Sequence, residues 1–195
     1  MKNIISHINI KHEEKGKGSV ILKATDQNGK VWSVYDIPST NPNKYRHIYK
    51  KVLNRVNKQN LNSLIIVDVG CSTGEPVEKF SSYLERKGID TYVVGVDYRE
   101  KSLEAAIKNS RIDEGHRALA QKLPFNNNYA DVVICLNLIN PSLPEKEQEL
   151  TYKELFRVCK YRNLVITEYI LDSKLGNHLF KQTAEEAGAN GWRYL

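Results

Sequence analysis

Short runs of alternating apolar and polar residues fill the first 36 residues of the chain. β-Prone runs cover residues 4–11, 19–25 and 30–35, and the sequences Gly16-Lys17-Gly18 and Asn28-Gly29 separate them. Asn-Gly favours the tight turn that joins two antiparallel strands. The pattern therefore predicts a small antiparallel β element at the N-terminus.

A turn-rich link over residues 38–42 precedes a predicted helix over residues 43–58. Apolar side chains recur in this helix at steps of three and four residues, which marks one buried face. These residues are Tyr45, Ile48, Tyr49, Val52, Leu53 and Val56. The remaining surface carries Lys44, Arg46, Lys50, Lys51, Arg55 and Lys58 and no acidic residue. The helix is therefore expected to be amphipathic, with a basic outer face.

From residue 61 onward, predicted strands alternate with predicted helices. The strands cover residues 64–69, 91–97, 117–121, 130–138 and 163–169, and the helices cover residues 75–87, 99–109, 145–159 and 173–187. Most of the strands are apolar along their length, which is typical of a parallel sheet covered on both faces. We therefore expect an α/β fold with a Rossmann-like, mostly parallel sheet, preceded by the small antiparallel β element and the basic helix.

The same pattern divides the chain into a β-rich accessory segment over residues 1–42 and a main domain over residues 43–195. About eight residues follow the last predicted helix, too few for a further hairpin at the sheet edge. Either the chain is a domain from a longer protein, or that edge is covered by the N-terminal strands or by a partner. A homodimer through the open edge is one such arrangement.

The composition is that of a globular protein, with 41% hydrophobic and 27% charged residues. No run approaches the roughly 18 apolar residues of a membrane-spanning helix, and the N-terminus lacks the pattern of a signal peptide. Cys71, Cys135 and Cys159 are not spaced as metal ligands and are expected to be free thiols. We therefore expect a cytoplasmic protein without a membrane segment or a metal site.

Positive charge is concentrated in the first third of the chain. Residues 1–60 contain twelve Lys or Arg and four Asp or Glu, a net charge of +8, whereas the whole chain carries +6. This asymmetry leaves two readings open, a solvated basic surface or a docking surface for RNA or another anionic partner.

The sequence VDVGCSTGE, residues 67–75, joins the first apolar strand of the main domain to a helix that has Pro76 in its first turn. In an open parallel sheet, ligands bind at such strand-to-helix loops. A dinucleotide loop needs the pattern G-x-G-x-x-G, but Ser72 and Glu75 stand where its second and third glycines would be. An acidic residue beside the helix start also repels a pyrophosphate. The loop is therefore not predicted to bind a dinucleotide.

The loop instead matches the pattern acid-x-Gly-x-Gly/Ser-x-Gly through Asp68, Gly70, Ser72 and Gly74. Asp97 ends the next strand, 23 residues after Gly74. The sequence AQKLPF over residues 120–125, then YADVV over residues 129–133, leads into the following strand, and LFRVCK over residues 155–160 precedes LVITE over residues 164–168. In their order and spacing, these motifs resemble the class I S-adenosylmethionine-dependent methyltransferases, in particular the small "LPF" type.

The resemblance implies a methyl-donor site with assigned positions. Asp97 would accept from both ribose hydroxyls, Asp68 would orient the loop and the donor ammonium group, and Tyr98 would pack on the adenine. The backbone N–H of Ala120 would face the adenine ring edge, and Asn137 would offer polar contacts to the methionine portion. The implied donor-binding residues are Asp68, Gly70, Cys71, Ser72, Gly74, Asp97, Tyr98, Ala120, Gln121 and Asn137.

Two departures from the family pattern bear on this site. Many relatives have an acidic residue before the alanine of the LPF segment, which holds the adenine amino group, whereas this chain has Leu119. That hydrogen bond is either absent or supplied by Gln121. Residues 160–163 read KYRN where relatives often have Pro-Gly-Gly.

The methyl acceptor is left open by the sequence. No Asn/Asp-Pro-Pro-aromatic motif follows the fourth strand, where residues 137–141 read NLINP, so amino-group methylases of adenine or glutamine are disfavoured. Glu168 and His178 are the candidate general bases, and Cys71 is interpreted as a packing residue. We expect methyl transfer to an O or N atom of a small molecule. The alternatives are an RNA or protein methyltransferase that docks substrate on the basic N-terminal third, and a non-catalytic binding module.

Overall fold

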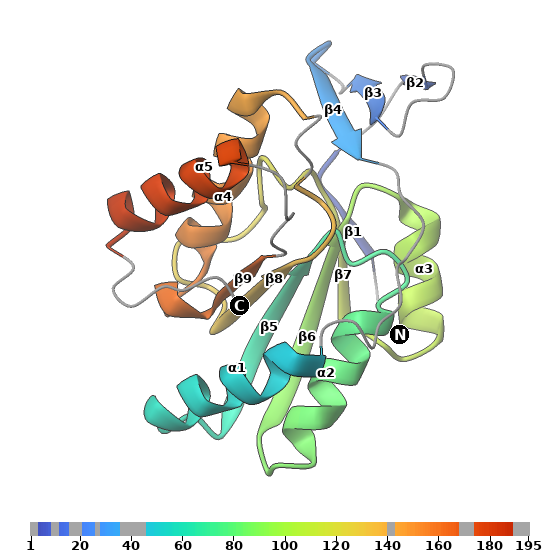
Figure 1. Ribbon diagram of the computed structural model, residues 1–195. Helices are drawn as coiled ribbons and strands as arrows, with labels where there is room; N and C mark the ends of the chain where they lie inside the picture. The colour runs from blue at the N-terminus through green and yellow to red at the C-terminus, as the bar shows by residue number, and fades with distance from the viewer. Residues whose placement is uncertain are drawn as a thin grey trace.

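The computed structural model describes residues 4–8, 12–15, 21–25, 28–35, 46–139, 143–167 and 174–188 (Figure 1). Its main feature is a six-stranded sheet in the order β1-β7-β6-β5-β8-β9, and every pairing in it is parallel. The strands are β1 (Ile4–Ser6), β5 (Ser63–Val69), β6 (Asp90–Asp97), β7 (Glu114–Arg117), β8 (Val132–Cys135) and β9 (Val165–Thr167). The predicted α/β fold with a mostly parallel sheet is confirmed.

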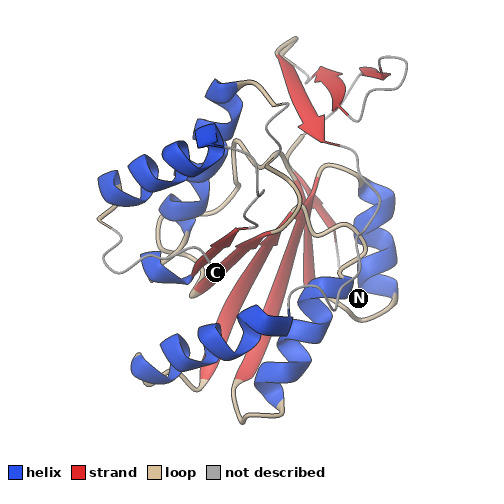
Figure 2. Cartoon of the chain, in the orientation of Figure 1, coloured by secondary structure: helices blue, strands red, loops and turns tan. Residues whose placement is uncertain are grey.

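Helices flank this sheet on both faces, as Figure 2 shows. They are α1 (Arg46–Lys58), α2 (Glu75–Glu85), α3 (Glu100–Lys108), α4 (Glu145–Val158) and α5 (Lys174–Glu186). Helices α2 and α3 pack on β6 and β7, and α4 packs on β8 and α5. Ile48, Tyr49, Val52 and Val56 of α1 are buried, which confirms the predicted apolar face. None of the described helices has the length and apolar character needed to span a bilayer.

A second, three-stranded sheet lies near the top of Figure 1. It consists of β2 (His12–Lys15), β3 (Ile21–Thr25) and β4 (Val31–Tyr35) in antiparallel pairing, with Gly29 in the β3–β4 turn at a φ of 77°. The predicted N-terminal antiparallel element is therefore present.

The first strand, however, does not belong to that small sheet. We predicted residues 4–11 as part of it, but β1 pairs in parallel with β7 at one edge of the large sheet. Ile4 packs near Gly115 and toward α3, so burial on the large sheet outweighs a local hairpin. At the opposite edge, no described residue pairs with the outer side of β9. Strand β1 therefore covers the β7 edge of the large sheet. It does not cover the β9 edge, where the sequence predicted that a C-terminal hairpin is missing.

Three predicted strand boundaries were also wrong. The strand predicted over residues 117–121 is β7 at Glu114–Arg117, and the strand predicted over residues 130–138 ends at Cys135. In the first case, Gly115 leaves room for Ile107 and Ile4, which favours pairing of an otherwise polar segment. The fifth strand, β9, begins at Val165 after a short 3-10 helix at Arg162–Leu164, and residues 168 and 169 lie outside the described part of the chain.

Two aspartates outside the cleft described below tie neighbouring strands together. Asp131 Oδ2 accepts a hydrogen bond from the backbone N–H of Ile65 at 2.9 Å. Asp113 Oδ2 accepts from the backbone N–H of Val93, also at 2.9 Å. The backbone N–H of each aspartate in turn donates to the carbonyl of the same partner residue, Ile65 for Asp131 and Val93 for Asp113. These reciprocal bonds fix the starts of β7 and β8 beside β6 and β5.

Candidate functional site

A cleft of about 1000 Å³, open in part to solvent, lies at the carboxyl ends of β5, β6, β7 and β8. Because parallel strands end at the same edge of a sheet, the loops that follow them converge there. The described residues that line it are Ser33, Asp68, Val69, Gly70, Cys71, Ser72, Pro76, Val96, Asp97, Tyr98, Arg99, Ala118, Leu119, Ala120, Gln121, Leu136, Asn137, Leu138, Ile139, Leu143 and Thr151. Nine of the ten predicted donor-binding residues are among them, and the tenth is Gly74.

The loop between β5 and α2 bends through three residues in the left-handed region. Gly70, Ser72 and Gly74 have φ values of 76°, 50° and 79°. Glycine adopts this conformation freely, whereas a serine is strained there. The backbone at the middle position of the pattern therefore has a conformation that favours glycine, and Ser72 adopts it in this chain.

The two glycines of this loop have different neighbours. A Cβ on Gly70 would come within 3.2 Å of the Leu138 side chain, which also lines the cleft. A Cβ on Gly74 would come within 3.0 Å of Arg111 Cβ. Gly70 thus allows the loop to lie against the far wall of the cleft, and Gly74 allows the first turn of α2 to pack beside the residue that follows α3.

Arg111 fixes the same loop from outside the cleft. Its guanidinium donates to the carbonyl of Thr73 at 3.1 Å and forms ion pairs with Glu75 at 3.1 Å and Glu78 at 3.0 Å. Glu75, which disfavoured a pyrophosphate in the sequence, is therefore part of the support of the loop. Arg111 was not predicted, because a lone arginine after a helix carries no motif.

Asp97, at the end of β6, is buried and fully oriented by backbone donors. Ser72 N–H donates to Asp97 Oδ2 and Arg99 N–H donates to Oδ1, each at 2.9 Å. Arg99 Nε lies 3.6 Å from Oδ1. Burial raises the pKa of Asp97, although these bonds and Arg99 oppose the shift. Each carboxylate oxygen has a second lone pair for a ligand in the cleft.

Asp68, on the neighbouring strand β5, is only 4% exposed and lines the same cleft. Within the described part of the chain, no residue donates a hydrogen bond to its carboxylate or pairs with it. Burial, and then the negative charge of Asp97, raise the pKa of Asp68 to about 7. A buried carboxylate without a donor is costly, and a ligand that brings a cation or N–H groups to this position would remove that cost.

At the other end of the cleft, Tyr98 and Leu119 form a small apolar cluster with Trp32 of β4. All three side chains are less than 10% exposed, and Lys30 Nζ lies 3.5 Å above the Trp32 ring. Only Tyr98 and Leu119 of the cluster line the cleft, so Trp32 supports this wall from behind. Ala120 follows in the wall. The contact of Trp32 could not be read from the sequence, because it joins segments 66 and 87 residues apart.

Gln121 connects the cleft to both the small sheet and α4. Its Nε2 donates to the Ser33 carbonyl and to Glu147 Oε2, each at 3.2 Å. Glu147 Oε2 also accepts from the Ser33 N–H at 2.9 Å. Neither Ser33 nor Glu147 was predicted, because no local pattern marks either residue.

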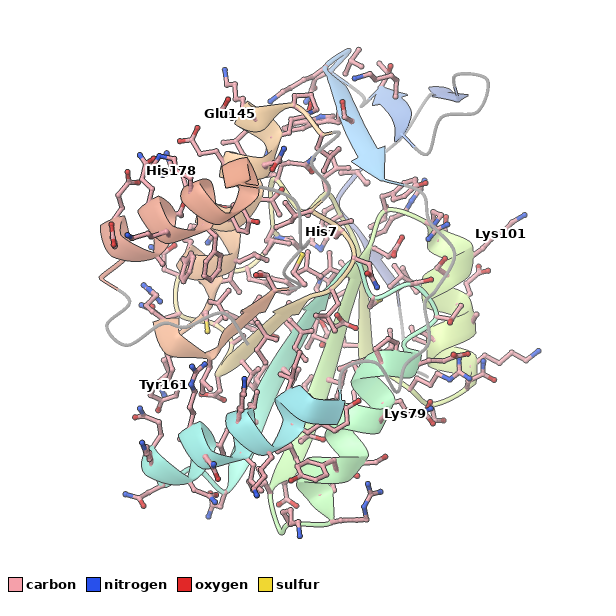
Figure 3. All side chains as sticks on the ribbon, viewed as in Figure 1. His7, Lys79, Lys101, Glu145, Tyr161 and His178 are labelled. Atoms are coloured by element: carbon pink, nitrogen blue, oxygen red, sulfur yellow. The ribbon has the colours of Figure 1, made fainter. Side chains whose placement is uncertain are left out.

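One of the two candidate bases, His178, does not lie at the cleft. His178 is exposed on α5, where Figure 3 labels it, and it is not part of the cleft lining. Glu168 lies outside the described residues. The Cys71 thiol is buried, and burial raises its pKa, so it does not supply a thiolate at neutral pH. Across the described ranges, no group of three His, Cys, Asp or Glu residues is arranged to hold a metal ion.

The basic residues of α1 also lie away from the cleft. Lys50 and Lys51 are exposed, but no described residue of α1 lines the cleft. The concentration of positive charge in the sequence therefore does not, by itself, place an anionic partner at this site.

Comparisons with known proteins give one family match and several similar structures. Residues 66–162 match the family model described as a methyltransferase domain. The structure is similar to an S-adenosylmethionine-dependent methyltransferase from Methanosarcina mazei, with 23% identity, a TM-score of 0.42 and coverage of 54% of this chain and 52% of that chain. A protein from Pyrococcus horikoshii OT3 gives 26% identity, a TM-score of 0.46 and coverage of 66% and 60%.

The CMeT domain of the citrinin polyketide synthase gives 13% identity, a TM-score of 0.52 and coverage of 73% of this chain and 41% of that one. This last likeness shows a shared fold. The chain thus spans less than two thirds of the length of these three solved chains. No curated protein matches the chain by sequence.

Proposed function

We propose that this chain, whose residues 66–162 match the family model of a methyltransferase domain, is a class I S-adenosylmethionine-dependent methyltransferase and transfers a methyl group from S-adenosylmethionine to an O or N atom of a small, uncharged acceptor. One observation carries the proposal. Asp68 and Asp97 end neighbouring parallel strands and line one cleft, and the loop between β5 and α2 donates to Asp97 through Ser72.

The described residues fit the polar groups of this donor. The carboxylate of Asp68, for which no described residue provides a donor, suits an ammonium group. The two free lone pairs of Asp97 suit two vicinal ribose hydroxyls, with hydrogen bonds of about 1.5–3 kcal/mol each. Tyr98 and Leu119 offer apolar surface for a flat ring. A dinucleotide fits worse, because two buried carboxylates would face its pyrophosphate.

The bound sulfonium supplies an already activated methyl group, so the protein contributes mainly orientation. Asp68 and Asp97 hold the two ends of the donor, and Gly70 lets the loop approach Leu138 across the cleft. Leu138, Ile139 and Leu143 line the same cleft and would contact an acceptor that reaches the methyl group of the bound donor. Exclusion of water by these apolar side chains strengthens the electrostatic contacts with both carboxylates.

The acceptor class follows from the rest of the lining. Within the described residues, the charged side chains in the cleft are Asp68, Asp97 and Arg99. The first two are assigned to the donor, and Arg99 pairs with Asp97. The lining residues that are neither charged nor assigned to the donor include Leu136, Leu138, Ile139, Leu143 and Thr151. An apolar wall with one hydroxyl favours an uncharged acceptor with an apolar body over a phosphorylated or polyanionic one.

In this proposal, residues 43–195 carry the donor-binding domain, and the segment over residues 1–42 closes one end of the cleft. The closure rests on Ser33, which lines the cleft, and on Trp32 behind Tyr98. The basic surface of α1 has no contact with the cleft in the described residues, so nothing there favours an RNA acceptor.

Calorimetric titration with S-adenosylhomocysteine tests donor binding. We expect wild-type protein to bind it and Asp97→Ala to lose affinity by about a hundredfold or more, because two charge-assisted hydrogen bonds are removed. Asp113→Ala is the matched control, since its carboxylate accepts a backbone N–H of β6 but lies outside the cleft.

Transfer of radiolabelled methyl from S-adenosylmethionine to a panel of small alcohols, phenols, amines and carboxylates then tests the reaction and the acceptor class. Failure of the wild type to bind S-adenosylhomocysteine refutes donor binding. Binding without transfer to any of these compounds favours a non-catalytic module, and preferential transfer to anionic compounds contradicts the acceptor assignment.

A further inference from the structure

The amide group of Gln121 is held in one orientation by its neighbours. The Ser33 carbonyl and Glu147 Oε2 both lie 3.2 Å from Gln121 Nε2. Both neighbours are hydrogen-bond acceptors, so only the NH₂ half of the amide can lie between them. A flipped amide would place its carbonyl oxygen against a carboxylate and another carbonyl.

This orientation determines what Gln121 presents to the cleft. The side chain is only 8% exposed and belongs to the lining of the cleft, and no described residue donates to its Oε1. Oε1 is not one of the fully buried polar atoms that lack a partner, so it is open to the cleft, and a ligand that covers it without donating a hydrogen bond loses about 1–3 kcal/mol. The cleft therefore offers a fixed acceptor at this point, and a matching ligand has to bring an N–H or O–H group.

The neighbours of Gln121 show which end of the cleft it serves. Ser33, which it contacts, directly follows Trp32, and Trp32 packs on Tyr98 and Leu119. In the proposed donor complex, these last two side chains surround the adenine ring. Leu119 has no polar atom, so it cannot hold the exocyclic amine of adenine.

We propose that Gln121 Oε1 accepts a hydrogen bond from the exocyclic amine of the donor's adenine, and that Glu147 and Ser33 position the Gln121 amide for this contact. The inference rests on the proposed function, since it requires the donor to bind in this cleft. Gln121 is then the residue that distinguishes a 6-aminopurine from other purines. Glu147 acts through Gln121, and recognition of the donor depends on the docking of β4 against α4, which lie side by side in Figure 1.

Calorimetry with two ligands tests this assignment: S-adenosylhomocysteine and its analogue in which hydrogen replaces the 6-amino group. We expect wild-type protein to prefer S-adenosylhomocysteine by about tenfold, in the range for one neutral hydrogen bond and an acceptor left unpaired. Gln121→Met keeps the length of the side chain and removes the acceptor, so its preference is expected to fall to within about twofold. Gln148→Met is the matched control, because Gln148 is a buried glutamine outside the cleft lining.

The positioning role of Glu147 has its own readout. Glu147→Ala is expected to reduce the preference for the 6-amino ligand, although Glu147 is not part of the cleft lining. Glu147→Gln is expected to restore it, because an amide oxygen can accept from the same two N–H groups. A merely structural role would change the melting temperature of both variants without changing the ratio of the two affinities.

The outcomes separate this inference from the proposed function. If wild-type protein does not bind S-adenosylhomocysteine, the proposed function fails. If it binds both ligands equally, or if Gln121→Met keeps the full preference while melting as a folded protein, the assignment of Gln121 is overturned and donor binding stands. A loss of preference in Gln121→Met, with full preference in Gln148→Met, supports the assignment.

Discussion

Replacing Asp68 with asparagine isolates the free-energy cost of burying this carboxylate in the ligand-free protein. Its pKa rises from 3.8 to about 7 on folding, first because of burial and then because of Asp97. At about 1.36 kcal/mol per pKa unit, this shift corresponds to roughly 4 kcal/mol of lost stability when Asp68 is ionised. An asparagine amide lacks that charge but is buried with few partners, at a cost of about 1–3 kcal/mol. We therefore expect Asp68→Asn to stabilise the ligand-free protein at pH 8 by about 1–3 kcal/mol.

The change of this stabilisation with pH is a more decisive test than its magnitude at one pH. Between pH 3.8 and about 7, the folded state holds a proton on Asp68 that the unfolded state has released, so the stability of the wild type falls as the pH rises through this window. The asparagine variant lacks this loss. The difference in unfolding free energy between the variant and the wild type is therefore expected to grow by about 3 kcal/mol from pH 5 to pH 8, whatever the cost of the amide.

Urea unfolding of both proteins at pH 5, 6, 7 and 8 measures this difference, because titrations shared by the two proteins cancel. Asp131→Ala is the control: it removes the acceptor of the Ile65 N–H, so this variant is expected to lose stability rather than gain it. The same Asp68→Asn protein should bind S-adenosylhomocysteine more weakly, since the partner of the ammonium group is gone. A difference that stays flat from pH 5 to pH 8 would refute the reasoning about Asp68.

Two further predictions concern packing next to the cleft. Gly95→Ala in β6 is expected to lower the unfolding free energy, measured in urea, by about 1–3 kcal/mol, because the added Cβ would lie 2.8 Å from Ile112 Cδ1 and 2.9 Å from Cys71 Sγ. Gly88→Ala is the comparison without a clash, because Gly88 lies in open space at a φ of 80°. An equal loss of stability in both variants would contradict the packing account. The three cysteines, Cys71, Cys135 and Cys159, are buried, and burial raises the pKa of each thiol. Mass spectrometry after treatment with iodoacetamide at pH 8 is therefore expected to find the native protein unmodified and all three cysteines labelled in urea. Rapid labelling of the native protein would show that the thiols are accessible.

The strands that end at Asp68 and Asp97, and the loop that follows the first of them, could be predicted from local sequence. An apolar run followed by Asp68 and Gly70 predicts a buried strand that turns directly into a helix, and Asp97 ends the next such run. Backbone conformation and strand periodicity are local properties, so the sequence carries them directly. In the structure, Asp68 and Asp97 both line one cleft.

The third strand of the main domain shows where local prediction fails. The segment Glu114–Arg117 contains two charged residues, a histidine and a glycine, and has little β propensity. It is a strand because β6 and β1 both pair with it and because Gly115 admits side chains from α3 and β1. Pairing with residues 109 positions away, as between His7 and His116, leaves no local signal.

The sequence by itself therefore determined the α/β class, the loop over residues 67–75 and the two carboxylates, because these depend on periodicity, turn chemistry and residue type over short distances. Only the tertiary structure decided which groups surround them. It left Asp68 buried without a donor among the described residues, which raises its pKa, and it brought Ser33, Gln121 and Glu147 together from three distant segments. Burial and the direction of an amide depend on what packs nearby, and those neighbours are fixed only when the whole chain folds.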